Sequence, residues 1–219
     1  MRRIVEIPGL YRLRISSIEI TELTDEVLEI IESYPVIADH LHIPLQAGSD
    51  TILKLMNRKY NTNYFLEKIT RIRKINPNIS ISTDVIVGFP GETDEFFQES
   101  YRFCEKIGFS KIHVFPYSIR CGTPASKFPN QIDGLKKKDR TKSLIALSNQ
   151  LEKEYMSKFL NTEIEVLMEQ TKDDYSYGHT SNYLSVKING KYNSESIVSV
   201  EIIDIDYPYC VAKEVVKQK

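Results

Sequence analysis

The sequence predicts an α/β fold followed by a small all-β barrel. Over residues 1–133, apolar runs of strand length alternate with stretches of helical periodicity, which is typical of parallel strands joined by helices. Residues 134–160 keep one amphipathic helical pattern, and from residue 161 the apolar residues alternate with polar ones, as in strands. These observations divide the 219 residues into an α/β domain, a linker helix and a β domain.

The composition is that of a folded protein. Hydrophobic residues make up 41% of the chain, which excludes a disordered chain and supplies enough apolar side chains for a core. No apolar run approaches the roughly 20 residues that a membrane span needs. Met1–Val5 imitates the start of a signal peptide, but Glu6 and Pro8 interrupt it, so we expect a cytoplasmic protein without a membrane partner.

The first strand is expected at Tyr11–Ser16, where apolar and basic residues alternate. A helix should follow Thr24, whose hydroxyl is a suitable N-cap, because Asp25 and Glu26 then lie at the positive end of the helix dipole. A second strand is expected at His40–Leu45.

The other elements of the α/β part follow in the same alternation. They are a short helix capped by Asp50, a helix ending at Asn76, a strand at Ile79–Val87, a helix from Thr93 to Ile107, and a strand at Lys111–Tyr117. Strands joined by helical connections predict a parallel sheet, because a parallel pair needs a crossover. Four strands are too few to close a barrel, so we expect the rest of the sheet to lie outside this sequence.

The charge changes sign between the linker helix and the tail. Residues 134–160 carry seven Lys and Arg against three Asp and Glu, whereas residues 162–219 carry six against ten. The net charge of −1 does not by itself predict a nucleic-acid partner. In the tail, strands are expected at Glu163–Leu167, Tyr183–Ile188 and Ile197–Ile205.

Polar and small residues gather where the expected parallel strands end. They are Ser16, Ser17, Glu19, Gln46, Gly48, Gly88, Gly91, Tyr117, Ser118 and Arg120. Ligands bind at the carboxyl ends of parallel strands, so a binding site is one interpretation. The other is that turns are polar and rich in glycine in any fold.

Asp84 interrupts an otherwise apolar strand. A buried carboxylate costs several kcal/mol unless it is partnered. Asp84 is therefore either a hydrogen-bond partner of a ligand inside the barrel mouth or the partner of Arg12 or Arg14 in a salt bridge.

No metal site is predicted from the histidines and cysteines. His40 and His42 share one face of a strand, but no acidic or cysteine ligand follows their spacing, so we interpret them as satisfied core residues. Cys104, Cys121 and Cys210 lie far apart and form no CxxC pair, which argues against a disulfide and against a metal site.

Four motifs follow one another across residues 10–125. They are Arg14–Glu19, His40–Asp50 with Met56–Tyr60, Thr83–Thr93, and His113–Thr123. In this order they resemble the signature of the MiaB-like radical S-adenosylmethionine (SAM) methylthiotransferases. His113–Thr123 is most similar to the MtaB subgroup, which adds a methylthio group at C2 of threonylcarbamoyladenosine at tRNA position 37. Glu165–Leu167 and Gly178–Tyr183 resemble the TRAM domain, an RNA-binding barrel.

The resemblance implies a partial radical SAM barrel of six strands, of which this chain would hold the last four, and a TRAM-like barrel at residues 161–219. It implies SAM-binding residues at Ser16, Glu19, Gln46, Asp84, Gly88, Phe115 and Tyr117. Phe115 and Tyr117 would flank the adenine, since aromatic rings offer a planar apolar slot. Contacts to the tRNA anticodon loop are expected from Lys136, Lys137, Lys138, Arg140 and Tyr183.

The CxxxCxxC motif of the family, whose cysteines bind the [4Fe–4S] cluster that cleaves SAM, has no counterpart in this sequence. We therefore expect an enzyme by family whose 219 residues alone bind no iron and are inactive. Anaerobic reconstitution that gave a stoichiometric cluster spectrum would contradict this expectation. The alternatives are a non-catalytic tRNA-binding module and half of a split enzyme whose N-terminal half is a separate chain.

Overall fold

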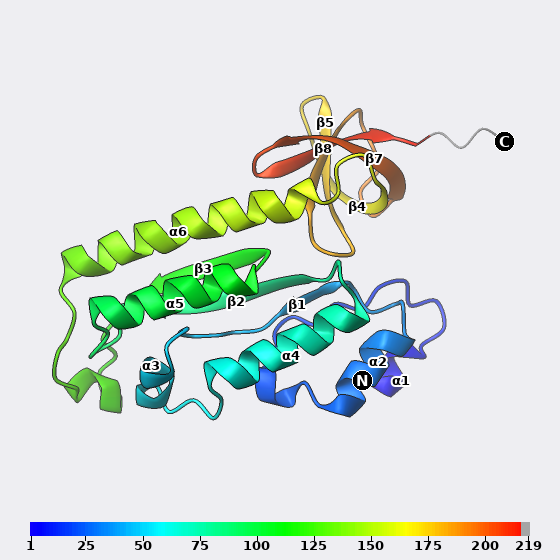
Figure 1. Ribbon diagram of the computed structural model, residues 1–219. Helices are drawn as coiled ribbons and strands as arrows, with labels where there is room; N and C mark the ends of the chain where they lie inside the picture. The colour runs from blue at the N-terminus through cyan, green and yellow to red at the C-terminus, as the bar shows by residue number, and fades with distance from the viewer. Residues whose placement is uncertain (216–219) are drawn as a thin grey trace.

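A computed structural model describes residues 1–215. It shows an α/β part around a parallel sheet, ordered β1-β2-β3, and a closed β-barrel, connected by one long helix (Figure 1). The predicted fold class is therefore confirmed. Among the described residues, no helix has both the length and the apolar character needed to cross a membrane.

The helices and strands of the α/β part alternate along the chain. They are α1 (Arg2–Val5), the 3-10 helix η1 (Ile20–Glu22), α2 (Asp25–Ser33), β1 (His40–His42), α3 (Asp50–Leu55), α4 (Thr62–Ile75), β2 (Ser80–Val87), α5 (Asp94–Ile107), β3 (Lys111–Pro116), the 3-10 helix η2 (Pro124–Lys127) and α6 (Gly134–Ser157).

Thr24 and Thr93 cap α2 and α5 as predicted, because each hydroxyl accepts a hydrogen bond from a backbone N–H of the first turn. The prediction for Asp50 is wrong. Asp50 is the first residue of α3, and its carboxylate accepts a 2.7 Å hydrogen bond from the backbone N–H of Thr62. Its side chain thus stabilises the start of the following helix, α4.

The sheet is parallel as predicted, but it has three strands where four were expected. Tyr11–Ser16 forms a single bridge, Leu13 to Ile37, and no regular ladder. The segment runs beside the sheet, where the backbone N–H of Ile18 donates to the carbonyl of His42 over 3.0 Å. The bridge partner Ile37 lies before β1, so Tyr11–Ser16 contacts the chain ahead of the sheet and forms no ladder with β1.

The two faces of the sheet differ in chemistry. Ile81, Val85 and Val87 are buried in a common core with residues of α4, α5 and α6. Leu144, Leu147 and Leu151, on the apolar side of α6, are part of that core. Side chains alternate between faces along a strand, so the other face carries the polar residues of β2. We call this second face, with its counterparts on β1 and β3, the polar face.

The barrel consists of β4 (Glu163–Lys172), β5 (Tyr175–Thr180), β6 (Ser185–Asn189), β7 (Ile197–Asp206) and β8 (Tyr209–Glu214), ordered β4-β5-β6-β8-β7. The sequence pattern did not predict β5 and β8. Gly178 lies in β5, where a glycine weakens a strand pattern. A Cβ at Gly178 would lie 2.1 Å from the carbonyl oxygen of Leu167, so only glycine permits this close pairing of β4 and β5.

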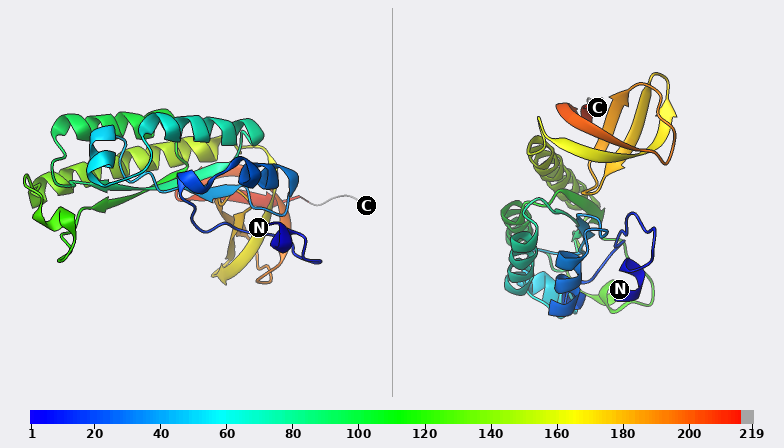
Figure 2. Two further views of the ribbon diagram at one scale, coloured as in Figure 1. Left: turned by 90° about the horizontal axis from the view of Figure 1, so that it is seen from below. Right: turned by 90° about the vertical axis from the view of Figure 1, so that its right-hand side faces the viewer.

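The long helix α6 places the barrel beside the amino-terminal edge of the sheet (Figure 2). Its 24 residues span about 36 Å at 1.5 Å per residue. At the junction, the backbone N–H of Asp39 donates to the Ser181 hydroxyl over 3.1 Å. The Tyr155 hydroxyl donates to the carbonyl of Asn78 over 2.6 Å and accepts from the Asn182 amide over 3.0 Å. The carboxyl-terminal edge therefore lies at the opposite end from the barrel.

Candidate functional site

Three of the residues expected at the strand ends lie together at the carboxyl-terminal edge of the sheet. The backbone N–H of Gln46 donates to the carbonyl of Asp84 over 2.8 Å, and the N–H of Tyr117 donates to the carbonyl of Val87 over 2.8 Å. These bonds align Gln46, Gly88 and Tyr117 on neighbouring chain segments. We call this edge, with Phe115, the strand-end site.

Gly88 is required by both its backbone and its surroundings. Its φ of +72° lies in the left-handed region, and its N–H donates to the Glu92 carboxylate over 2.6 Å. A Cβ at Gly88 would lie 2.4 Å from Cγ of Lys137, whose ammonium donates to the carbonyl of Tyr117 over 3.1 Å. The start of α6 is thereby packed directly onto the strand-end site.

The two aromatic residues of the strand-end site differ in exposure. Phe115 is 50% exposed although it lies on a sheet strand. The ring of Tyr117 packs edge-on against Phe89, with ring centroids 5.1 Å apart, and its hydroxyl is buried without a hydrogen-bond partner. Buried hydroxyls are normally hydrogen-bonded, so this one is suited to donate to a bound molecule.

Glu19 and Ser16 do not share one location. The Glu19 carboxylate accepts a 3.0 Å hydrogen bond from Arg58, a residue that follows α3. Ser16 instead lines a cavity near the opposite edge of the sheet, together with His42. The structure therefore separates Ser16 from Gln46, Gly88 and Tyr117.

Asp84 lies on the polar face and pairs with a histidine. Its Oδ2 is 3.3 Å from Nε2 of His42. Burial lowers the pKa of the neighbouring His113, and the negative charge of Asp84 counteracts part of that effect. Arg14 reaches the carbonyls of Thr180 and Ser181 in the β-barrel instead. Of the two interpretations of Asp84, the salt bridge to Arg12 or Arg14 is thus corrected: the partner within ion-pairing distance is His42.

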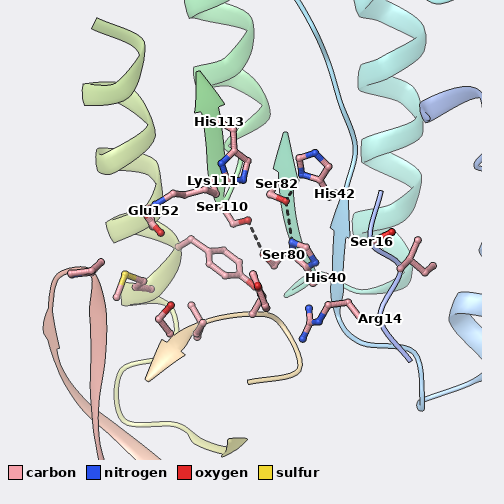
Figure 3. A pocket seen from close by; sticks show the side chains of 17 residues that line it. Arg14, Ser16, His40, His42, Ser80, Ser82, Ser110, Lys111, His113 and Glu152 are labelled. Carbon is pink, nitrogen blue, oxygen red and sulfur yellow. Dashed lines mark hydrogen bonds and ion pairs between the residues drawn. The ribbon is translucent and has the colours of Figure 1, made fainter. Parts of the chain in front are cut away.

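A cavity of about 480 Å³ lies between the amino-terminal edge of the sheet, α6 and the β-barrel (Figure 3). Its lining is Arg14, Ile15, Ser16, His40, His42, Ser80, Ser82, Ser110, Lys111, His113, Glu152, Tyr155, Met156, Tyr183, Leu184, Ser185 and Pro208. The cavity was not predicted from the sequence. It could have been inferred from the polar residues that alternate along three neighbouring strands, because alternation places their side chains on one face of the sheet.

Two of the three histidines of this cavity are hydrogen-bonded through one ring nitrogen each, whereas Nδ1 of His40 is buried without a partner, so the expectation of satisfied core residues is met only in part. Nε2 of His40 and Nδ1 of His42 each lie 3.0 Å from the Ser82 hydroxyl. Burial and the positive charge of Arg14 lower the pKa of His40 to about 4, so its imidazole is neutral at pH 7.

The lysines expected to contact RNA lie at the start of α6, near the strand-end site. Lys136 forms a 2.9 Å ion pair with Asp94, and Lys138 is exposed. Arg140 is different, because its side chain is only 4% exposed and bonds to Glu92 and Asp94 over 2.7 Å each. The expectation that Arg140 contacts RNA is corrected: its guanidinium holds α6 against the start of α5.

Tyr183 lies at the other end of α6, in the turn between β5 and β6. Its ring stacks on His179, with centroids 4.6 Å apart and planes 19° apart. The Arg14 guanidinium lies 4.3 Å from the same centroid, and the His40 ring lies 4.9 Å from it. A base that stacked on Tyr183 would have to displace one of these groups.

The cysteines present do not fit an iron–sulfur cluster. Cys104 is buried in α5, Cys210 is buried in β8, and Cys121 is exposed in the segment after β3. Within residues 1–215, no group of at least three His, Cys, Asp or Glu side chains has the geometry of a metal site. A cluster needs several thiolates around one centre, which these three residues do not supply.

Comparison with known proteins places this geometry in a family context. Residues 1–104 match the radical SAM superfamily. A Bacillus subtilis (strain 168) protein named threonylcarbamoyladenosine tRNA methylthiotransferase MtaB is 44% identical over 209 residues, which are 93% of this chain and 46% of that protein. A tRNA-2-methylthio-N(6)-dimethylallyladenosine synthase of Acetivibrio thermocellus is 38% identical over 183 residues, 82% of this chain and 38% of that protein.

A solved structure supports the fold. Coproporphyrinogen III oxidase (HemN) from Escherichia coli, a radical SAM enzyme, superposes with a TM-score of 0.53 at 19% identity, over 64% of this chain and 32% of that one. The chain spans less than half the length of the curated relatives described above.

Proposed function

Over most of its length the chain is a homologue of the MtaB- and MiaB-type radical SAM methylthiotransferases, and on this premise we propose that it supplies the strand-end half of a tRNA methylthiotransferase site. The proposed reaction is C2 methylthiolation of N6-threonylcarbamoyladenosine at position 37. The observation that carries the proposal is the convergence of Gln46, Gly88 and Tyr117 on one edge, with an unpaired hydroxyl and an exposed aromatic ring. The proposed domains are residues 1–133, the linker helix 134–160 and a TRAM-like barrel at 161–219.

The strand-end site fits the adenosyl part of SAM. The buried hydroxyl of Tyr117 offers a donor to a polar group, and the half-exposed ring of Phe115 offers a planar apolar surface to the adenine. Asp84 lies farther down the same sheet, on the polar face. When bound, SAM supplies the carbon radical chemistry of the superfamily. The residues of this chain bind and orient it.

These 219 residues do not supply the cluster that this chemistry needs, because their three cysteines lie in separate places. No step is therefore assigned to a cluster on this chain. We propose that the isolated 219 residues bind SAM weakly and are inactive in methylthiolation. A separate chain carrying the cluster is the arrangement that a split enzyme would need.

A tRNA-binding role without catalysis is the second candidate. The observation that favours it is the exposed lysine cluster at the start of α6, beside the strand-end site. Lysines neutralise RNA phosphates whether or not chemistry follows. The two candidates differ in one respect: only the first requires SAM to bind.

Titration calorimetry of the 219-residue chain with SAM tests the proposal. We expect binding, and Tyr117→Phe should weaken it by about 2- to 10-fold, which corresponds to one hydrogen bond. Tyr101→Phe is the matched control, since it removes a hydroxyl from α5 on the other face of the sheet. Absence of binding, or equal affinities of Tyr117→Phe and the parent chain, would refute the proposed site.

A further inference from the structure

The cavity between the sheet and the β-barrel is a second candidate site, separate from the strand-end site. Residues at the starts of β1, β2 and β3 line it, whereas Gln46, Gly88 and Tyr117 lie past the ends of these strands. Its volume of about 480 Å³ lies in the range of small-molecule sites, roughly 300–1,000 Å³. Its walls come from the sheet, from α6 and from the β-barrel, as Figure 3 shows.

Two buried nitrogen atoms of this lining have no hydrogen-bond partner. His40 is only 6% exposed, and its Nδ1 makes no hydrogen bond while Nε2 contacts the Ser82 hydroxyl. Nη1 of Arg14 is also buried and unpaired, and Nη2 makes only long contacts of 3.4 and 3.5 Å to two carbonyls of the β-barrel. Buried polar groups of this kind are rare unless they have a function.

The charge of the cavity favours an anion. Lys111 and Glu152 neutralise each other through a 2.6 Å ion pair. Arg14 has carbonyl and aromatic neighbours but no carboxylate within ion-pairing distance among the lining residues. The charged lining residues therefore sum to +1, and the Glu169 carboxylate outside the lining acts on Arg14 without forming an ion pair with it. A guanidinium with unused N–H groups matches the paired oxygens of a phosphate or a carboxylate.

We propose that this cavity binds a small oxyanion-bearing ligand of roughly mononucleotide size. The phosphate or carboxylate lies on the Arg14 guanidinium, and the His40 imidazole lies beside it. The hydroxyls of Ser16 and of Ser82 on the polar face bind the remaining polar groups. The ring of Tyr183, already packed against Arg14, closes one side.

Titration of the full 219-residue chain tests the proposal with four probes. Adenosine 5′-monophosphate and citrate present a phosphate and a carboxylate, adenosine lacks the anion, and inorganic phosphate lacks the organic part. We expect the monophosphate or citrate to bind at least about tenfold more tightly than adenosine, because only their anionic groups form charge-assisted hydrogen bonds with the Arg14 guanidinium. The preferred probe identifies the oxyanion. Binding of inorganic phosphate as tight as that of the best organic probe would overturn the proposed ligand size.

The location is tested by histidine ring NMR and by matched variants. The preferred probe should shift the ring resonances of His40 and His113, which line the cavity. Arg14→Gln should weaken binding at least about tenfold, and Arg14→Lys should retain part of it. Arg102→Gln on α5 makes the same change of charge at an exposed position outside the cavity and should have no effect.

Several results would overturn the proposal. One is the absence of saturable binding by every probe. Another is binding that leaves the His40 and His113 resonances unchanged, and a third is equal affinity of the parent chain and Arg14→Gln. If Arg14→Gln does not fold, the resonance shifts in the parent chain decide. Failure of SAM to bind at the strand-end site would not affect these outcomes, because the two sites lie at opposite edges of the sheet.

Discussion

The Glu92 carboxylate and the Arg140 guanidinium form an almost completely buried ion pair, with side chains 1% and 4% exposed. Glu92 also accepts a 2.6 Å hydrogen bond from the N–H of Gly88, so the pair supports the turn of the strand-end site. Burial raises the pKa of Glu92, whereas the Gly88 N–H and Arg140 act to lower it. The carboxylate depends on its partners to remain charged at low cost.

Removal of Arg140 alone should therefore be strongly destabilising. We expect Arg140→Met to lower the free energy of unfolding by about 3–5 kcal/mol, because it leaves a buried charge without its partner. The double variant Glu92→Gln with Arg140→Met should recover part of this loss, since the Gln carbonyl can still accept from Gly88. Lys136→Met, which removes an exposed ion pair on the same helix, should cost less than about 1 kcal/mol.

The same variants give a pH dependence with a defined sign. The pKa of Glu92 in the folded chain is raised above its ordinary value of 4.5, and loss of Arg140 raises it further. A carboxyl group whose pKa is raised by folding stabilises the fold at pH values below its pKa in the unfolded chain. This stabilisation is lost as the pH rises through the pKa of the group in the folded chain. The deficit of Arg140→Met should thus grow from pH 4 upward, measured by urea unfolding. An equal dependence in the double variant would contradict this assignment.

At the level of single residues, sequence reasoning located the strand ends but not the side-chain partners. Thr24 and Thr93 were correctly predicted as caps because a cap depends on a few neighbouring residues. The partners of Asp84 and Arg140 depend on which elements pack together. The sequence suggested an arginine of a neighbouring strand as one possible partner of Asp84, and RNA as the partner of Arg140. In the structure Asp84 pairs with His42, and Arg140 pairs with Glu92.

At the level of elements, α6 is the part that connects the two halves. Its first turn packs on Gly88, and its last turns contact the β-barrel through Tyr155. The Tyr155 hydroxyl is the link, because it bonds both to Asn78 of the α/β part and to Asn182 of the barrel. Burial raises the pKa of Tyr155, so the hydroxyl stays protonated and able to donate.

Loss of this hydroxyl should loosen the junction. We expect Tyr155→Phe to lower the free energy of unfolding by about 1–3 kcal/mol, because the buried amide of Asn182 and the carbonyl of Asn78 lose their partner. Hydrogen exchange should increase for the backbone amides around Asn182. Tyr101→Phe on α5 is the control and should change neither quantity by more than about 0.5 kcal/mol. Equal effects of the two variants would remove Tyr155 from the proposed linking role.

Element prediction succeeded where a local pattern was strong and failed where pairing decided. The helices α2, α4 and α5 have long apolar periods and were found. Tyr11–Ser16 has the alternation of a strand, but its one bridge, from Leu13, is to Ile37 ahead of β1, and pairing of this kind cannot be read from a local pattern. In the tail, β5 was missed because Gly178 weakens its pattern while permitting the close approach to Leu167.

At the scale of the whole molecule, α6 separates the residues proposed to contact RNA. Lys138 lies at its start, beside the strand-end site, and Tyr183 lies beyond its end, at the β-barrel. The helix spans about 36 Å, several times the screening length of roughly 8–10 Å at physiological salt. An RNA that contacts both residues must extend along α6.

Two variants of the full chain test whether tRNA does so. Lys138→Gln should reduce the slope of log affinity against log salt by about 0.7–0.9, the value of one phosphate contact. Tyr183→Ala should lower the affinity by about 1–3 kcal/mol if a base displaces one of its stacked neighbours, with the salt slope unchanged. Because Lys138 and Tyr183 lie at opposite ends of α6 and have no neighbouring residue in common, the two effects on tRNA affinity should add in the double variant.

Filter binding with tRNA over a series of salt concentrations measures both effects. Lys106→Gln on α5 removes one exposed charge outside α6 and should leave the slope unchanged. An effect of Lys138→Gln together with none of Tyr183→Ala would confine the RNA to the strand-end site. Tyr183 would then not bind RNA, because three groups already pack on its ring. The role of the β-barrel would be to hold α6 and the cavity in place.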